Sequence, residues 1–329
     1  MFILLVLLLA FGVGFSVRRG GICLVGATKE IIEQQSAKTL LFIIEAMTTA
    51  LAITVTAAIL FPEYIQFSKS HDLTFMLIGG ALLYGIGAGL NGGCALGTLN
   101  RLMSGQLNFV GTILGIGLGF FLYLLVMPLE EAPDKYSLME ERRAFYYLIP
   151  ILIIAWSIVG YRLWQFIRGR EATSGSSLKA FLHAPIARDF IAIFVLGAGA
   201  ALLYLLLGHA FDYSQWIMTF ERILFKDAEI SDHFIYVSLT TLGLLCGILV
   251  ASIAARGFAL SPVEWRLLNL KVLSGGFMGF GAGFIHGGND TLILYGVPTT
   301  AFHAPFAIIL IMVGVALVMQ VQKKLNRSD

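Results

Sequence analysis

The sequence is poor in charged residues. Lysine, arginine, aspartate and glutamate together make up 13% of the 329 residues, whereas 58% are hydrophobic. This balance, with a mean hydropathy of +0.85, excludes an ordinary soluble globular protein and predicts an integral membrane protein in a lipid bilayer. The net charge of +2 and the lack of runs rich in lysine or arginine give no support for nucleic acid as a partner.

Cysteine is scarce as well, with three residues in the chain. Cys23, Cys94 and Cys246 form neither a CxxC motif nor a zinc-binding spacing with histidine, so we expect no disulfide framework, no metal site and no cofactor. The motifs HExxH and GxSxG and the Walker sequence are also missing. The sequence therefore predicts no catalytic residues and no enzyme.

What the sequence does contain is an apolar stretch from Gly79 to Leu107 that glycines interrupt repeatedly. Each glycine inside a helix costs roughly 1 kcal/mol relative to alanine, so this stretch predicts a broken helix. We expect its first part to end near Asn91 to Gly93 and its second part to begin at or next to Cys94. A break at membrane depth is tolerated only where the freed backbone groups face protein or water, so it indicates a polar path.

A second copy of this pattern occurs late in the chain. Two interrupted hydrophobic segments at corresponding places in two halves are the best sequence indicator of a transporter's binding site. With one residue inserted in the second copy, the corresponding residues are Gly85–Gly89 with Gly279–Gly283, Gly92-Gly93 with Gly287-Gly288, and Cys94 with Asn289.

The apolar segments predict an all-α polytopic membrane protein with about nine transmembrane helices, short or broken re-entrant helices, and two pseudo-repeated halves. The segment from Arg18 to Gln35 is expected to form a short amphipathic or re-entrant element. The expected spans are Met1–Val17, Thr39–Phe61, Phe75–Leu99, Phe109–Met127, Phe145–Tyr161, Phe190–Leu207, Phe234–Ala255, the second broken segment Gly275–Ala301, and His303–Val321.

The predicted domains are a first transmembrane half (1–161) with two glycine-cysteine motifs, a basic cytoplasmic connector (162–189), and a second half (190–329) with a diverged copy of the broken helix. Basic residues favour the cytoplasmic side. Arg18 and Arg19 follow the first apolar segment, which we expect to be retained, so the N-terminus is expected outside and the C-terminus in the cytoplasm of a plasma (inner) membrane.

The loops are consistent with this orientation. Acidic loops at Glu63 and at Glu130-Glu131 are expected outside, as is an acidic loop from Phe211 to Asp232. Lys271 is expected on the cytoplasmic side.

At RRGGICLVGA, GAGLNGGCALGTLNRL and the second-half GFGAGF, the sequence resembles the YeeE/YedE sulfur-transport family. The resemblance covers most of the chain. It implies a channel-like permease of the bacterial or archaeal inner membrane that takes up thiosulfate or a related small sulfur-containing anion, with a cytoplasmic sulfur-carrier protein as a candidate partner. It also implies that cysteines near the pathway centre contact the sulfur of the passing ion.

Cys23 and Cys94 match the two first-half cysteines of that family pattern. Asn289 stands where thiosulfate-transporting members carry a further cysteine, so the resemblance leaves the carried anion open. A selenium compound or another small anion is the alternative substrate. A membrane docking subunit and an embedded sulfur-handling enzyme are the alternatives of another class.

The candidate pathway residues lie at the two breaks and at the first cysteine motif. The N-terminus of a half-helix presents unpaired N–H groups and a partial positive charge that suit an oxyanion. A neutral buried thiol adds a polarizable sulfur that suits a thio group, and we expect Cys94 to be neutral. The candidates are Cys23, Asn91, Gly92, Gly93, Cys94, Thr98, His286, Gly287, Gly288, Asn289 and Asp290.

Several of these residues have an alternative interpretation. Asn91 is as well placed to cap a helix end as to line the path, and Asn289 or Asp290 could cap a half-helix that begins at Thr291. His286 and Asp290 are spaced i, i+4, which allows an ion pair or a proton relay. Lys29 and Arg101 could attract an anion at the cytoplasmic mouth, or only snorkel toward the interface.

The remaining cysteine and a second set of glycines favour structural roles. Cys246 lies in the middle of an apolar span and is expected to be inert. Gly111, Gly115 and Gly119 recur every four residues, a spacing that predicts close packing between membrane helices.

Overall fold

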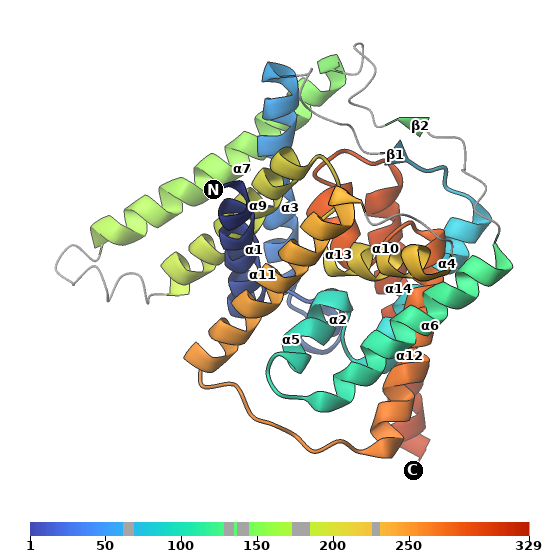
Figure 1. Ribbon diagram of the computed structural model, residues 1–329. Coiled ribbons are helices and arrows are strands. Elements are labelled where there is room, and N and C mark those ends of the chain that lie inside the picture. The colour runs from blue at the N-terminus through green and yellow to red at the C-terminus, as the bar shows by residue number, and fades with distance from the viewer. Residues whose placement is uncertain (62–68, 128–134, 137–144, 173–184, 226–230, 329) are drawn as a thin grey trace.

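Figure 1 shows a computed structural model of the chain, which describes residues 1–61, 69–127, 135–136, 145–172, 185–225 and 231–328. It is built from helices, with one antiparallel pair of short strands, β1 (Lys69–Ser70) and β2 (Lys135–Tyr136). The acidic residues Glu63, Glu130 and Glu131 and residues 173–184 of the predicted connector lie outside the described residues.

The helices follow the apolar segments closely. In chain order they are α1 (Phe2–Gly20), α2 (Leu24–Gln34), α3 (Lys38–Leu60), α4 (Phe75–Asn91), α5 (Ala95–Leu102), the 3₁₀ turn η1 (Leu107–Phe109), α6 (Val110–Val126), α7 (Phe145–Ala172), α9 (Pro185–Leu207), α10 (Tyr213–Phe225), α11 (Asp232–Ala254), α12 (Trp265–Phe284), α13 (Asn289–Thr291), the π-helical turn η2 (Leu292–Gly296) and α14 (His303–Ser328).

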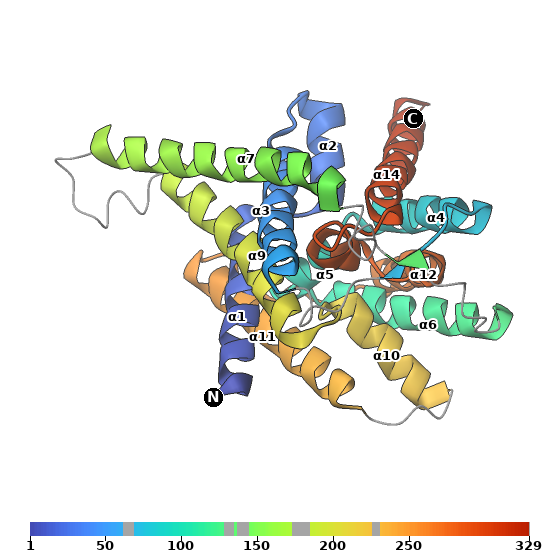
Figure 2. The same ribbon diagram turned by 90° about the horizontal axis from the view of Figure 1, so that it is seen from above.

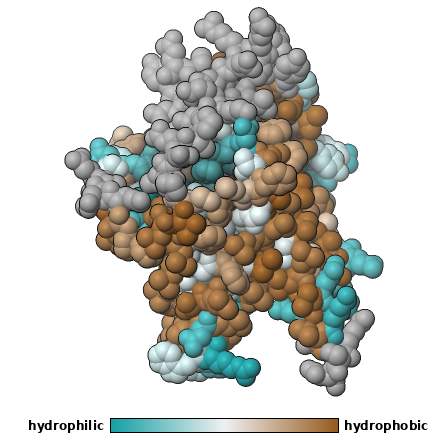
Figure 3. Space-filling model, turned by 90° about the vertical axis from the view of Figure 1, so that its right-hand side faces the viewer, coloured by the Kyte–Doolittle hydropathy of each residue, from teal (hydrophilic) through white to brown (hydrophobic). Residues whose placement is uncertain are grey.

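Within the described residues, eight helical segments are long and apolar enough to cross a membrane, or nine if the bent pair Trp265–Phe284 and Asn289–Gly296 forms one span. The prediction of an all-α polytopic membrane protein is therefore confirmed. On the face shown in Figure 3, apolar residues form a broad band with hydrophilic residues at either end. That distribution fits a bilayer around the middle of the molecule.

Both predicted breaks are confirmed. Helix α4 ends at Asn91, Gly92 follows with a positive φ of 71°, and α5 begins at Ala95. Helix α12 ends at Phe284, and the chain bends by 51° before the segment that starts at Asn289.

The helices pack in two groups, as Figure 2 shows from above. One group contains α4, α6, α12 and α14, and the other contains α1, α3, α7, α9 and α11. Each group takes helices from both halves of the sequence. The two broken helices α4 and α12 lie against each other, so the two copies of the glycine pattern meet.

The glycine contacts explain how these helices approach so closely. A Cβ at Gly115 would lie 2.1 Å from the carbonyl oxygen of Val272, and one at Gly119 would lie 2.1 Å from that of Gly276. Gly111 also faces α12, so the packing role predicted for this glycine set is confirmed. Backbone–backbone contact of this kind needs residues without side chains.

The structure differs from the sequence prediction in three places. The segment from Phe211 to Asp232 is not a loop throughout, because it contains the amphipathic helix α10, which packs on α6 and α11. Helix α7 continues to Ala172, well into the range assigned to the connector. Lys271 is buried within α12 instead of lying free at the cytoplasmic surface.

Candidate functional site

The two cysteines of the glycine-cysteine motifs lie next to each other at the centre of the protein. Cys23 directly precedes α2 and Cys94 directly precedes α5, so each occupies the N-cap position of a short helix. Their sulfur atoms are 3.5 Å apart, with the Cys94 thiol donating to that of Cys23, and both are free thiols. The first turns of two half-helices therefore converge on one pair of thiols.

Backbone N–H groups surround both sulfur atoms. Those of Val25, Gly26 and Cys94 face the Cys23 sulfur, and those of Leu24 and Gly97 face the Cys94 sulfur. Helix N-termini of this kind carry a partial positive charge. The site is therefore electropositive without a charged side chain.

Gly97 leaves room for the thiol pair. A Cβ at this position would lie 2.7 Å from the Cys23 sulfur and 3.7 Å from the Cys94 sulfur. Any side chain at residue 97 would displace Cys23, so the glycine is required for the two thiols to meet.

Asn289 brings the second broken helix to the same point. Its Oδ1 accepts the backbone N–H of Ala95 at 3.1 Å and the hydroxyl of Tyr84 at 2.8 Å. Its Nδ2 is buried and has no hydrogen-bond partner among the described residues. Asn289 thus caps the first turn of α5 and holds an unused N–H donor beside the Cys94 N-cap.

Asn91 and Thr98 brace the first break. The Nδ2 of Asn91 donates to the carbonyl of Gly93 at 2.7 Å and to Oγ1 of Thr98 at 2.8 Å, and its Oδ1 accepts the Thr112 hydroxyl at 2.8 Å. The Lys271 ammonium donates to the Asn91 carbonyl. Asn91 and Thr98 are fully buried. The hydrogen bonds of Asn91 hold the chain reversal at the first break in place.

Asp290 fixes α10 to the second break. Its carboxylate accepts the backbone N–H of Ser214 at 3.1 Å and the Ser214 hydroxyl at 2.5 Å. The neighbouring Thr291 donates its hydroxyl to Asp212 at 2.7 Å. Asp212 lies outside the candidate spans. Its burial and the nearby Asp290 raise its pKa to about 8.

The structure directs His286 and Asp290 to different partners. His286 has a positive φ of 56° within the second break, and its ring stacks on that of His71 at 3.5 Å. Gly287 and Gly288 follow it, and the N–H of Gly288 donates to the Thr291 hydroxyl at 3.2 Å. The half-helix begins at Asn289, two residues earlier than expected.

The two predicted mouth residues are exposed, and the Nε of Arg101 would lie 3.8 Å from a Cβ at Gly93. Lys29 forms an ion pair with Glu33 at 3.7 Å, and Arg101 lies over the ring of Phe109 at 5.2 Å. Cys246 is exposed on α11 and contacts neither of the other cysteines. In the described part of the chain, no group of three or more histidine, cysteine, aspartate or glutamate side chains is arranged to hold a metal ion.

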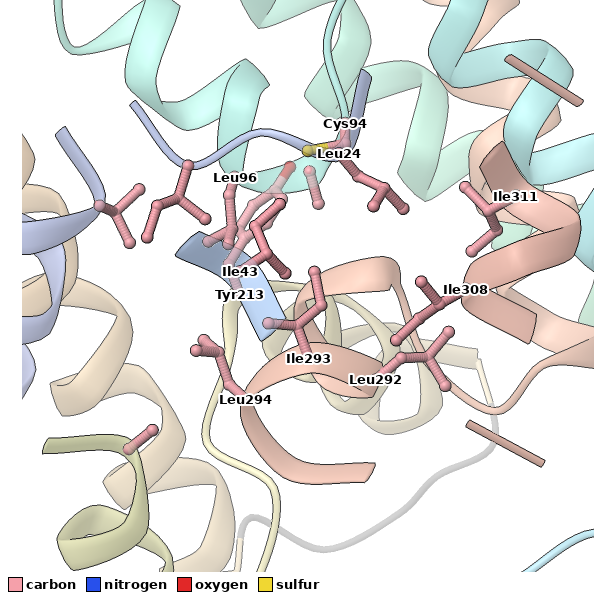
Figure 4. Packing of buried hydrophobic residues seen from close by; sticks show 14 of the residues in the cluster. Leu24, Ile43, Cys94, Leu96, Tyr213, Leu292, Ile293, Leu294, Ile308 and Ile311 are labelled. Atoms are coloured by element: carbon pink, nitrogen blue, oxygen red, sulfur yellow. The ribbon is translucent and has the colours of Figure 1, made fainter. Parts of the chain in front are cut away.

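Sequence reasoning missed four residues that shape the site: Tyr84, Tyr213, Ser214 and Lys271. Lys271 carried a usable signal, since an ionisable residue within an apolar helix indicates a function. The Tyr213 hydroxyl is buried with no partner among the described residues, and Tyr213 lies in the same group of side chains as Cys94 and Leu96 (Figure 4). Nothing in the local sequence distinguishes Tyr84 or Ser214.

The fold and site define a polytopic membrane protein in which broken helices place thiols and helix N-termini at a buried centre. A family model described as sulphur transport matches residues 19–317, and the chain belongs to this sulphur transport family. The protein is therefore a multi-pass membrane transporter of a sulfur compound. A search of curated proteins finds no match.

Proposed function

We propose that this protein takes up a small sulfur-containing anion of the thiosulfate type across the inner membrane, past Cys23 and Cys94. The observation that carries this proposal is the convergence of two thiols and two helix N-termini, with the sulfur atoms 3.5 Å apart. In the proposed orientation the N-terminus is outside, the C-terminus is cytoplasmic, and the anion moves inward.

The chemistry of the site supports an ion with both sulfur and oxygen atoms. A neutral thiol is polarizable and a weak donor, which suits a terminal thio group better than a hard oxyanion. The unused Nδ2 of Asn289 offers an N–H donor to an oxygen atom of the same ion. The helix N-termini favour its negative charge.

Buried apolar side chains lie along the proposed path. Figure 4 shows Cys94 and Leu24 on one side of a group of buried apolar side chains, with Leu292 and Ile293 of the second break on the other. An apolar constriction excludes water and ions until its side chains move apart. Passage of an anion therefore requires this group to separate.

Inward transport of an anion also needs a driving force. A potential that is negative inside opposes each negative charge by about 2.3 kcal/mol per 100 mV. A cytoplasmic sulfur-carrier protein that removes sulfur on arrival would maintain the inward concentration gradient. Such a partner is part of the proposal.

The direct test is uptake of thiosulfate, labelled with ³⁵S at its terminal sulfur, into proteoliposomes that contain the purified protein. We expect saturable uptake, competed by unlabelled thiosulfate and weakly by sulfate. Cys23→Ser and Cys94→Ser should each lower uptake strongly, because the serine hydroxyl is a harder, less polarizable group. Cys246→Ser is the matched control and should behave as the wild type.

Three outcomes contradict the proposal. Wild-type uptake rates in Cys94→Ser would show that its sulfur is unnecessary. Failure of every labelled sulfur anion to enter, together with no growth of a sulfur-auxotrophic host on thiosulfate, sulfite or sulfate, would favour a docking subunit. Conversion of the label without movement would favour an enzyme.

The position of Asn289 favours one alternative substrate. Its Nδ2 is a buried donor with no partner among the described residues, at the position where the family resemblance leads us to expect a further cysteine. An anion without a terminal thio group, such as sulfite or selenite, would place an oxygen atom at this donor. Stronger competition by these anions than by thiosulfate would identify that alternative.

A further inference from the structure

Five histidines gather around one cavity on the far side of the second break from the thiols. The cavity has a volume of about 390 Å³, and we call it the histidine vestibule. Its histidines come from five separate stretches of the chain, whereas the sixth histidine, His183, lies outside the described residues. The five are His71, His209, His233, His286 and His303.

The topology places all five at the same end of the helices. His71 follows α3, His209 follows α9, and His233 lies in the first turn of α11. His303 begins α14, and His286 lies in the break after α12. In the proposed orientation this end faces outside, so the histidine vestibule lies where an incoming anion arrives.

The imidazole rings are in direct contact. The rings of His71 and His286 are stacked at 3.5 Å with an interplanar angle of 7°, and His71 and His303 meet at 4.9 Å. A second pair, His209 and His233, lies at 3.9 Å. Protonated rings at these distances repel each other, so an empty vestibule disfavours the charged forms.

Two observations show that neutral rings are favoured when no anion is present. The Nδ1 of His303 accepts the backbone N–H of His71 at 3.2 Å, so this nitrogen carries no proton here. Burial lowers the pKa of His209, which lies outside the candidate spans. An anion among these rings would offset their mutual repulsion and favour their protonation.

Two carboxyl groups near the vestibule accept hydrogen bonds from neighbouring residues. Asp212 accepts the Thr291 hydroxyl, and Asp290 accepts hydrogen bonds from Ser214. Arg222 of α10 adds a positive charge close to His233 and His286. Other titratable or charged groups on the elements around the vestibule include Asp72, Tyr204, Asp212, Tyr213, Glu221, Arg222, Asp232, Asp290 and Tyr295.

The vestibule is continuous with the second break. Thr291 and Leu292 line it, and Leu292 belongs to the same buried apolar cluster as Cys94. An ion held by the histidines would therefore lie directly before the apolar constriction. Charge neutralisation at this position also lowers the barrier to an apolar passage.

We propose that the histidine vestibule binds the incoming oxyanion together with at least one proton, so that the protein works as an anion–proton symporter. The imidazoles gain protons as the anion arrives and release them with it toward the cytoplasm. This inference rests on the proposed function, because it assigns a driving force to the same transport step. A co-transported proton offsets the potential that opposes an anion.

The test uses proteoliposomes that contain the full chain, an internal pH-sensitive dye and ³⁵S-labelled thiosulfate outside, with the membrane potential clamped at zero. Uptake should acidify the interior. A gradient of about one pH unit, acid outside, should accumulate the label about tenfold for each coupled proton, because one pH unit is a tenfold proton ratio. His286→Gln and His303→Gln should lose most of this gradient-driven accumulation.

Thermal unfolding in detergent shows whether His286→Gln and His303→Gln fold. If either fails to fold, His209→Gln provides a second measurement. Cys246→Ser on α11 is the control and should accumulate label as the wild type does. Label uptake without acidification, or an unchanged response to the pH gradient in all three histidine variants, would overturn the symport inference while leaving the proposed function intact. Absence of label uptake in the wild type would overturn both.

Discussion

The side chain of Asn289 caps the half-helix that begins at Ala95, with its Oδ1 3.1 Å from the Ala95 nitrogen. The two residues are far apart in the sequence and belong to different copies of the broken-helix pattern. Through this bond the second break stabilises the first at the position next to Cys94. The site therefore depends on both copies at once.

Asn289→Ala should destabilise the protein and abolish transport. The substitution leaves the Ala95 N–H and the Tyr84 hydroxyl without their acceptor, which costs about 1–3 kcal/mol for buried groups. Thermal unfolding in detergent measures the loss. Asn289→Asp keeps the acceptor but adds a negative charge. It should therefore be more stable than the alanine variant and still lose anion uptake. Equal stability of the alanine variant and the wild type would contradict this role.

Gly97→Ala should abolish uptake while leaving the helices in place. The added methyl group would lie 2.7 Å from the Cys23 sulfur, so the thiols must move apart. The matched control is Gly79→Ala on α4, where a Cβ meets nothing within 4 Å. Label uptake and circular dichroism of both variants test this prediction. Full uptake by Gly97→Ala would show that the close approach of the thiols is unimportant.

Gly119→Ala should destabilise the contact between α6 and α12. The methyl group would meet the carbonyl oxygen of Gly276 at 2.1 Å, and overpacking of this kind costs about 1–3 kcal/mol. Gly160→Ala on α7 has open space around it and serves as the control. The thermal midpoint in detergent should fall for the first variant and stay the same or rise slightly for the second. A fall of equal size in both would show that the close contact at Gly119 is not its cause.

Asp212→Asn should change how stability depends on pH. Because the pKa of Asp212 is raised to about 8, the folded carboxyl stays protonated between about pH 4 and pH 8 while the unfolded one ionises. This ionisation lowers the free energy of the unfolded state, so the free energy of unfolding of the wild type falls as pH rises through that window. The asparagine variant lacks this contribution, since its side chain does not titrate.

Subtracting the thermal midpoint of the wild type from that of Asp212→Asn should therefore give a larger value at pH 8 than at pH 5. Glu264→Gln, at an exposed carboxylate, is the control. Parallel pH profiles for Asp212→Asn and the wild type would argue against a buried protonated carboxyl.

The sequence predicted the helices and both breaks because the forces involved are local. Apolar runs of about 20 residues define spans, and clustered glycines interrupt helices wherever they occur. The amphipathic helix α10 was missed because the acidic residues in and around it resemble those of a loop, although Glu221 within it and Asp212 before it are buried. Lys271 was expected on the cytoplasmic side because basic residues favour that side of the membrane.

By itself, the sequence determined the class of protein, the approximate number of spans and the two points at which helices break, since hydrophobic length and glycine content act through neighbouring residues. Only the tertiary structure decided that Cys23 meets Cys94, that Asn289 caps the opposite half-helix, and that five histidines share one cavity. Such contacts join residues far apart in the chain. They depend on how two groups of helices pack, and each group contains helices from both halves of the sequence. No local sequence pattern encodes this packing.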